Sequence, residues 1–174
     1  LVRSRGLGDV YKRQMISRPV DVIRTSLNGT ENLLELAKEK QVRSMVYVSS
    51  MEMYGVLNLQ DDQMVTEEMT GYLNPLALRS NYPESKRMCE NMCVAYGTQY
   101  EVPVKIARLA QTFGAGVLPG ENRVFAQFAR SVMKGSDIVL HTEGKSEGNY
   151  CYTADAVRAL LTILVKGENM QAYN

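Results

Sequence analysis

The chain has 174 residues, of which 45% are hydrophobic and 22% are charged, and its formal net charge is +1. This length supports one compact core and is short for two ordinary domains. A nearly neutral chain gives no electrostatic reason to expect nucleic acid or an anionic membrane as a partner. No apolar run approaches the roughly 18 residues of a membrane span, so we expect a globular protein outside the membrane.

The cysteines indicate a reducing compartment. Three cysteines, an odd number, do not make a disulfide framework, so we expect a cytoplasmic protein. Cys89 and Cys93 are one helical turn apart and could in principle bind a metal. Because the chain has one histidine and no CxxC motif, we predict no metal site and expect both thiols in the core.

The first residues differ in character from the rest. Residues 1–14 are basic and lack the apolar centre of a signal peptide. They resemble translated adapter or vector sequence, and a native basic arm is the alternative. We therefore treat them as a foreign or disordered leader and leave them out of the fold prediction.

The first half of the remaining chain predicts a helix, a strand and a loop. Apolar residues recur on one face over residues 19–40, which predicts a helix. Gly29 inside it costs about 1 kcal/mol relative to Ala, so we expect close packing to require it. Residues 44–49 predict a short buried strand, and the polar stretch 57–79 predicts a long loop.

Helices and strands alternate in the second half. The sequence predicts helices at about 83–100, 123–134 and 154–166, a glycine-rich loop at 114–120, and strands at 104–109, 138–141, 150–152 and 171–174. Strands that alternate with helices of ten or more residues are typical of an α/β fold with a parallel, doubly wound sheet.

Tyr82 and Lys86 form a YxxxK spacing at the start of the second long helix. Residues four apart share a helical face, so the phenol and the ammonium can meet. An ammonium and a positively charged nicotinamide both favour the phenolate, which can take a proton from a substrate hydroxyl. The carbon of that hydroxyl then gives hydride to NAD⁺. Because this spacing also arises by chance, it needs a supporting context.

Three further segments supply that context. Residues 28–34 read NGTENLL, residues 46–55 read VYVSSMEMYG, and residues 106–114 read IARLAQTFG. In α/β sheets ligands bind beyond the carboxyl ends of the strands, where the second segment ends. Together with the YxxxK pair, these segments resemble the nucleotide-sugar epimerases and dehydratases of the extended short-chain dehydrogenase/reductase family. The resemblance covers about residues 19–174 and implies a partial Rossmann-type sheet.

The resemblance also implies a site. Ser50 matches the residue that hydrogen-bonds the reacting sugar hydroxyl, Tyr82 the general base, and Lys86 the residue that holds the nicotinamide ribose. Ser49, Tyr82 and Lys86 are the expected cofactor contacts, and Ser50, Glu52, Tyr82 and Lys86 the expected catalytic residues. The implied cofactor is NAD, with NADP as the alternative, and the implied substrate is a nucleotide sugar that passes through a transient keto intermediate.

Glu52 bears on the kind of reaction. A carboxylate two residues after the serine resembles UDP-glucuronate decarboxylases and dTDP-glucose dehydratases, where it does acid–base work after oxidation. Met51 stands where the dehydratases carry an aspartate, which argues against a 4,6-dehydratase. We expect an epimerase first and a decarboxylase-like or dehydratase activity second. A non-catalytic cofactor-binding relative is the alternative class, and the intact Tyr82–Lys86 pair argues against it.

The substrate side departs from the family pattern. Gln111 stands where the family has an asparagine that contacts the nucleotide diphosphate, and Asn149 lies beside the place of a diphosphate-binding arginine. His141 falls where relatives often place an aromatic ring against the base. With Ser50, these three residues are the expected substrate contacts.

The missing arginine affects the expected substrate. Gly148 occupies its place, and a guanidinium binds phosphate bidentately, which glycine cannot replace. Either another cation does this work, with Lys145 or Arg123 as candidates, or the substrate is not a standard nucleotide-diphosphate sugar.

The resemblance finally predicts an organisation into parts. Residues 15–114 match the C-terminal part of an NAD-binding domain with the YxxxK pair, and residues 115–174 a substrate-binding region cut short at its end. The family implies a homodimer in which the helices at about 20–39 and 83–100 pack against their symmetry mates. Met88, Met92 and Leu33 are candidate contact residues.

The absence of a glycine-rich pyrophosphate turn yields a first prediction. No GxGxxG or GxxGxxG occurs after residue 14. We expect the reading frame upstream of Met15 in the genome to encode a strand followed by GxxGxxG, because this turn lays the pyrophosphate on a helix N-terminus. Sequencing that region checks this, and a stop codon or an unrelated domain there would contradict it.

Overall fold

The computed structural model describes residues 14–60, 62–116, 120–121, 123–140, 143 and 148–174. Its elements in chain order are α2 (Pro19–Glu39), β1 (Met45–Ser50), the 3₁₀ turns η1 (Met51–Tyr54) and η2 (Leu78–Ser80), α3 (Asn81–Tyr100), β2 (Val104–Leu109), β3 (Gln111–Phe113), α4 (Val124–Lys134), β4 (Tyr150–Tyr152), α5 (Thr153–Lys166) and β5 (Ala172–Tyr173). No helix in these described ranges is long and apolar enough to cross a membrane.

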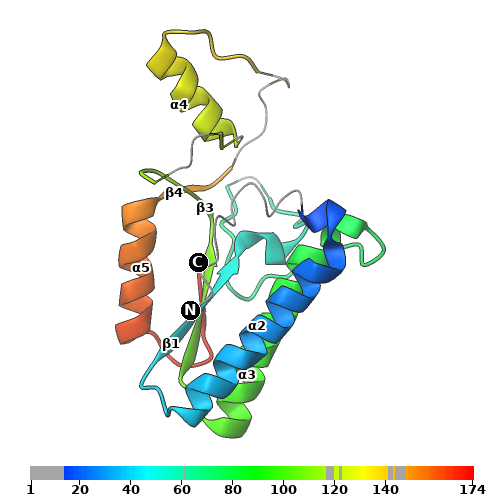
Figure 1. The fold of residues 1–174 in the computed structure, drawn as a ribbon, viewed down its shortest axis with the longest axis vertical. Helices are drawn as coiled ribbons and strands as arrows, with labels where there is room; N and C mark the ends of the chain where they lie inside the picture. Colours follow the sequence, from blue (N-terminus) through cyan, green and yellow to red (C-terminus); the bar gives the residue numbers. More distant parts are fainter. Residues whose placement is uncertain (1–13, 61, 117–119, 122, 141–142, 144–147) are drawn as a thin grey trace.

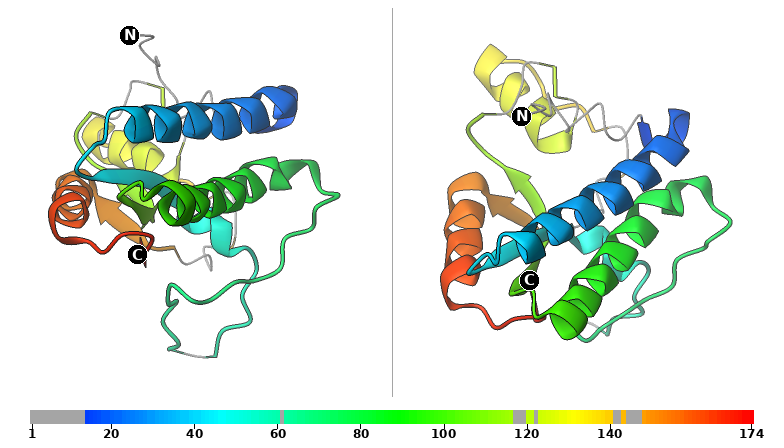
Figure 2. Two further views of the ribbon diagram at one scale, coloured as in Figure 1. Left: turned by 90° about the horizontal axis from the view of Figure 1, so that it is seen from below. Right: turned by 60° about the horizontal axis from the view of Figure 1, so that its bottom comes forward.

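A three-stranded parallel sheet organises the fold. Its strand order is β1-β2-β5, and β1 pairs with β2 in register from Met45 opposite Val104 to Ser50 opposite Leu109. Helices α2 and α3 lie side by side on one face, and α5 lies on the other (Figures 1 and 2). Helices on both faces of a parallel sheet confirm the predicted doubly wound α/β class.

The hydrophobic core lies between the helix pair and the sheet. It consists of Leu34, Ala37, Cys93, Val102, Val104 and Ile106. Cys89 and Cys93 are both fully buried, which confirms that these thiols are core side chains. Burial raises the pKa of Cys93 to about 12, so this sulfur stays a protonated, apolar group.

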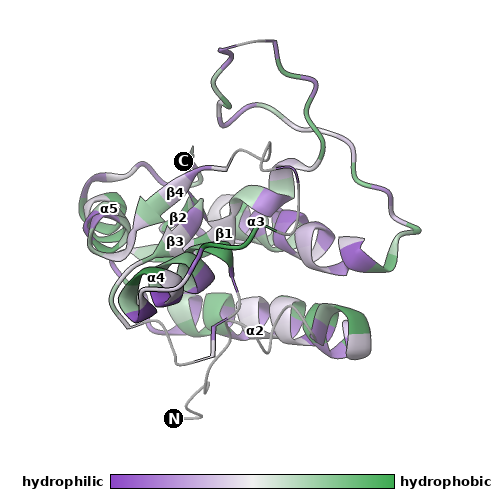
Figure 3. Cartoon of the chain, turned by 90° about the horizontal axis from the view of Figure 1, so that it is seen from above, coloured by the Kyte–Doolittle hydropathy of each residue, from purple (hydrophilic) through white to green (hydrophobic). Residues whose placement is uncertain are grey.

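Two regions connect to this body. Strands β3 and β4 pair in parallel as a separate two-stranded sheet, with α4 beyond it (Figure 1). The segment between η1 and η2 projects as a long loop, as the sequence predicts (Figures 2 and 3). An antiparallel bridge between Val56 and Tyr72 closes the base of this loop, so the two chain segments that enter and leave it lie side by side there.

One prediction about packing is wrong. A Cβ at Gly29 would meet no atom within 4 Å, so close packing within the described chain does not require glycine there. The helical period explains this, because it turns Val22, Thr30 and Leu34 inward and leaves Gly29 on the exposed outer side.

Two strand predictions also need correction. Residues 138–140 of the expected strand 138–141 form no strand, and these three apolar residues are all exposed, because no described neighbour pairs with them. Conversely, Gln111–Phe113 is a strand that the local pattern did not predict. Its partner is Tyr150–Tyr152, far along the chain, so only the tertiary fold creates it. Other boundaries differ from the predictions by one or two residues.

The core analysis predicts a large effect at Leu34. Its side chain is 0% exposed, so Leu34→Ala should lower the free energy of unfolding by about 2–5 kcal/mol through lost burial and the remaining cavity. Denaturant unfolding measures this. Leu161→Ala is the matched control, because Leu161 on α5 is 57% exposed and should change stability by about 0.5 kcal/mol or less. Equal losses in the two variants would contradict the assigned core.

Candidate active site at the carboxyl end of strand β1

Lys86 joins helix α3 to the end of strand β1. Its Nζ donates a hydrogen bond of 2.8 Å to the Val48 carbonyl oxygen. The same ammonium lies 4.9 Å from the ring centroid of Tyr47 and 5.8 Å from that of Tyr82. Burial lowers the pKa of Lys86, and the charge of Glu90 offsets this only in part. The structure therefore brings the predicted tyrosine and lysine together beside the strand.

The local sequence explains where this pair stands. Helix α3 begins at Asn81, and Pro83 suits its first turn, where a backbone N–H has no helical partner. The Ser85 hydroxyl donates to the Asn81 carbonyl oxygen at 2.6 Å, which reinforces the same turn. Tyr82 is therefore fixed in the first turn and Lys86 in the next, on a shared face.

Ser50 and Glu52 lie where β1 ends and turn η1 begins. The Ser50 hydroxyl oxygen accepts a hydrogen bond of 3.3 Å from the Glu52 backbone N–H, which caps the turn. Glu52 Oε2 lies 3.6 Å from Arg79 Nη2, and their side chains are 35% and 47% exposed. Water weakens such an exposed ion pair, so it orients the carboxylate more than it stabilises the fold.

Arginines that the sequence analysis missed bring the two halves of the site together. Arg79 precedes Tyr82 by three residues, so its contact with Glu52 reaches from the start of α3 to turn η1. Arg87 donates to the carbonyl oxygens of Met53 and Gly71, each at 2.7 Å. No local motif marks either arginine, because their partners are backbone groups or residues distant in sequence.

Ser49 faces the opposite way from its neighbour Ser50. Its hydroxyl donates to Glu90 Oε1 at 2.5 Å, and the residue is buried. Successive side chains of a strand point to opposite faces, which accounts for this placement. A cofactor contact by Ser49 remains a prediction. Because the Ser49 side chain points into the interior, its backbone groups would have to make that contact.

Two of the predicted substrate residues, Gln111 and Asn149, lie at the small sheet. The Gln111 N–H donates to the Asn149 carbonyl oxygen at 3.2 Å, and Gln111 Nε2 lies 3.6 Å from an ideal Cβ built on Gly148. The structure thus brings Gln111 and Asn149 together beside Gly148. His141 and Lys145 lie outside the described residues.

Arg123 reaches strand β3, where its Nη1 donates to the Thr112 carbonyl oxygen at 3.5 Å, but it already has a carboxylate partner. Its Nη2 lies 2.7 Å from Oε2 of the buried Glu121, and its guanidinium stacks 4.6 Å from the Phe125 ring centroid. A guanidinium whose charge is balanced in this way is a weaker anion ligand than an unpaired one. Within the described ranges, no group of three or more histidine, cysteine or acidic side chains could hold a metal ion.

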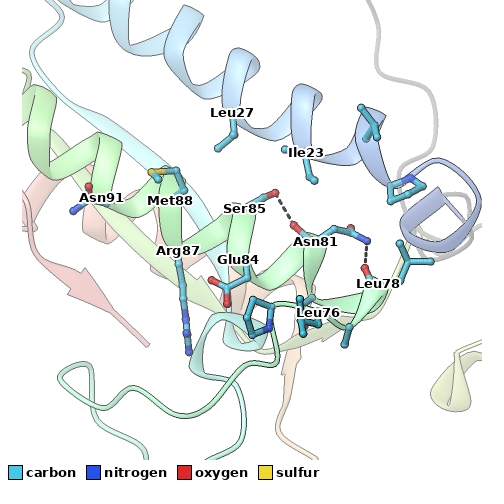
Figure 4. Close-up of a pocket in the computed structure, with 15 residues that line it drawn as sticks. Ile23, Leu27, Leu76, Leu78, Asn81, Glu84, Ser85, Arg87, Met88 and Asn91 are labelled. Atoms are coloured by element: carbon cyan, nitrogen blue, oxygen red, sulfur yellow. Dashed lines mark hydrogen bonds between the residues drawn. The ribbon is translucent and has the colours of Figure 1, made fainter.

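A separate groove of about 860 Å³ lies between α2, α3 and the segment before η2. Figure 4 shows Ile23 and Leu27 of α2 facing Ser85 and Met88 of α3 across it. Ser50, Tyr82 and Lys86 do not line it. The groove is therefore a feature of the outer helix surface and distinct from the candidate active site.

A parallel sheet with helices on both faces defines a Rossmann-type fold, and the YxxxK pair stands beside the end of one of its strands. The NAD dependent epimerase/dehydratase family matches residues 10–174, and the chain belongs to this family. NAD is accordingly the cofactor of the family.

Comparisons with individual proteins agree with this assignment. UDP-glucuronic acid decarboxylase 1 of Xenopus tropicalis is 32% identical over 146 residues, which cover 84% of this chain and 34% of that protein. The dTDP-glucose 4,6-dehydratase of Bacillus anthracis in complex with NAD superposes with a TM-score of 0.73 at 26% identity, covering 87% of this chain and 46% of that one.

A third comparison concerns the fold alone. The UDP-glucose 4-epimerase of Thermotoga maritima with UDP-glucose has a TM-score of 0.80 at 21% identity and covers 96% of this chain and 52% of that one. The chain therefore spans between a third and about half of the length of the proteins that it matches.

Proposed function

We propose that the chain is the catalytic and substrate-binding part of an NAD-dependent enzyme that modifies a nucleotide-activated sugar through a transient keto intermediate. The observation that carries this proposal is the grouping of Tyr82, Lys86, Ser50 and Glu52 around the end of β1. In this proposal the chain forms part of a longer enzyme, the parent enzyme. All three cysteines are free, which is in keeping with the proposed cytoplasmic location.

The residues of this site fit the nicotinamide side of NAD. A lysine ammonium has three N–H donors, and Lys86 directs one to Val48, so others can reach ribose hydroxyls beside Tyr82. When bound, the nicotinamide accepts hydride from the sugar carbon. Tyr82 takes the proton of the sugar hydroxyl. Ser50 accepts from the Glu52 amide, so its own O–H can donate to the sugar oxygen and hold it in place.

Glu52 distinguishes two activities. An epimerase, which the sequence favours, returns hydride to the other face of the keto sugar and needs no carboxylate. A decarboxylase loses carbon dioxide next to the keto group and needs acid–base assistance at the neighbouring carbon. Glu52 beside Arg79, together with the 32% identity to a UDP-glucuronic acid decarboxylase, favours decarboxylation as the second candidate.

Separate variants in the parent enzyme test these roles. Tyr82→Phe removes the proton acceptor and should lower turnover by about 10²- to 10⁴-fold, so that no enzyme-bound NADH forms. Glu52→Gln should still form NADH, and in a decarboxylase the NADH should persist because the following step is blocked. Absorbance of bound NADH after mixing with nucleotide sugar is the measurement.

Tyr100→Phe is the control, because Tyr100 lies on the same helix far from the strand end and is 42% exposed. It should leave turnover unchanged. Full activity of Tyr82→Phe would remove Tyr82 as the base. Unchanged turnover of Glu52→Gln would favour 4-epimerisation over decarboxylation.

We further propose that the parent enzyme is a homodimer formed through α2 and α3. Leu33 is 55% exposed and Met88 is 52% exposed, so apolar side chains face outward on both helices. The open space at Gly29 would let a second helix approach closely. Met92, the third candidate contact, packs against the core instead.

A charge on the outer face of α3 should therefore prevent dimer formation. Met88→Asp places a carboxylate in the proposed contact, where its desolvation opposes association. Light scattering at micromolar concentration should show a dimer for the parent enzyme and a monomer for this variant, with unchanged circular dichroism. Val165→Asp, which changes a 78%-exposed residue on α5, should remain dimeric. A monomeric parent enzyme would contradict the proposal.

A further inference from the structure

We propose that Arg108, held by Glu90, is a positioning residue that fixes turn η1 and the following loop at the end of β1, and so sets the positions of Ser50 and Glu52 relative to Tyr82. This inference rests on the proposed function and adds residues that do not touch the substrate.

The Glu90–Arg108 pair is buried and doubly hydrogen-bonded. Arg108 Nε and Nη2 donate to Glu90 Oε1 at 3.1 Å and Oε2 at 2.8 Å, and each side chain is only 9% exposed. Burial acts to lower the pKa of Arg108, but its hydrogen bonds to Glu90 and Tyr54 outweigh burial and raise it. The guanidinium therefore keeps its charge and its planar set of donors.

The remaining donor of Arg108 points out of the pair toward the loop. Nη1 donates to the Tyr54 hydroxyl oxygen at 2.8 Å and to the Glu67 carbonyl oxygen at 2.7 Å. Tyr54 ends turn η1, and Glu67 belongs to the projecting loop. One guanidinium thus bonds both to turn η1 and to the loop that follows it.

The same network reaches the catalytic strand and the end of the chain. Glu90 Oε1 also accepts the Ser49 hydroxyl at 2.5 Å, directly beside Ser50. On the other side, the Tyr54 hydroxyl donates to Asn174 Oδ1 at 2.6 Å. The network therefore spans strand β1, strand β2, helix α3 and turn η1.

Stability alone does not account for such a pair. A buried ion pair can often be replaced by well-packed apolar residues without loss of stability, because desolvating both charges is unfavourable. Apolar packing is not directional, whereas each hydrogen bond of Arg108 requires an acceptor at a defined position. The pair is suited to fixing a geometry, in this case that of turn η1.

The position of turn η1 matters because its first residues carry the proposed chemistry. Glu52 lies within this turn, and Ser50 caps it. Glu90 is one helical turn beyond Lys86 on α3. The Glu90–Arg108 pair therefore links turn η1 to the same helix that carries Tyr82. A displacement of about 1 Å between reacting groups can reduce a rate by about 100-fold.

Tyr54→Phe in the parent enzyme tests this without leaving a buried charge unpaired. It removes only the hydroxyl that joins Arg108 to Asn174. Hydrogen–deuterium exchange should rise about tenfold in residues 51–54 and 62–72, while α3 and β2 exchange as before. In the same variant kcat should fall about tenfold and KM for NAD should stay the same, because the cofactor contacts of Lys86 are intact.

Two variants complete the test. Tyr96→Phe is the matched control, because it removes a 2.7 Å hydroxyl–carboxylate bond that joins α3 to Glu35 of α2, away from turn η1, and should change neither measurement. Arg108→Lys keeps the charge but loses the planar fork, so it should resemble Tyr54→Phe.

Three results would overturn the proposal. They are unchanged exchange in Tyr54→Phe, a uniform rise in exchange across all helices and strands, and an exchange increase confined to the loop without any loss of kcat. A parent enzyme that converts no nucleotide sugar at all would contradict the proposed function instead. Exchange in the loop would then still decide whether Arg108 holds the segment.

Discussion

The parallel pairing of β1 with β2 is the constraint on which the rest of the structure depends. Its register sets Ser50 opposite Leu109, so both strands end at the same edge of the sheet. Parallel neighbours need a crossover connection, and α3 is the helix of that connection. Because α3 starts close to the edge where β1 ends, Tyr82 and Lys86 come to stand beside that strand end.

Hydrogen bonds to backbone carbonyl groups hold this arrangement together. Lys86 bonds to the Val48 carbonyl oxygen, Arg87 to those of Met53 and Gly71, and Arg108 to that of Glu67. A carbonyl oxygen accepts a hydrogen bond whatever side chain its residue bears. Lys86 thus holds strand β1 itself, while Arg87 and Arg108 hold the segment after it, whose sequence can therefore vary.

The small sheet is held differently from the main one. Strands β3 and β4 are three residues each. Aromatic rings pack around them: the ring centroid of Phe113 lies 5.8 Å from that of Phe125 and 5.9 Å from that of Tyr152. Helix α5 and strand β5 then return to the main sheet, where β5 pairs with β2. Gln111 and Asn149 thus stand on a short, separate unit, so the proposed substrate contacts can change independently of the proposed reacting groups beside β1.

The sequence by itself determined the fold class, the long helices and the catalytic spacing. These are local properties. Apolar residues with a helical period define α2, and a separation of four residues puts Tyr82 and Lys86 on one helical face. The tertiary structure alone decided the inward turn of Ser49 toward Glu90, the meeting of Arg79 with Glu52, and the pairing of β3 with β4. Each joins residues at least 27 positions apart, and which distant partners meet follows from the packing of the whole chain, which no local pattern encodes.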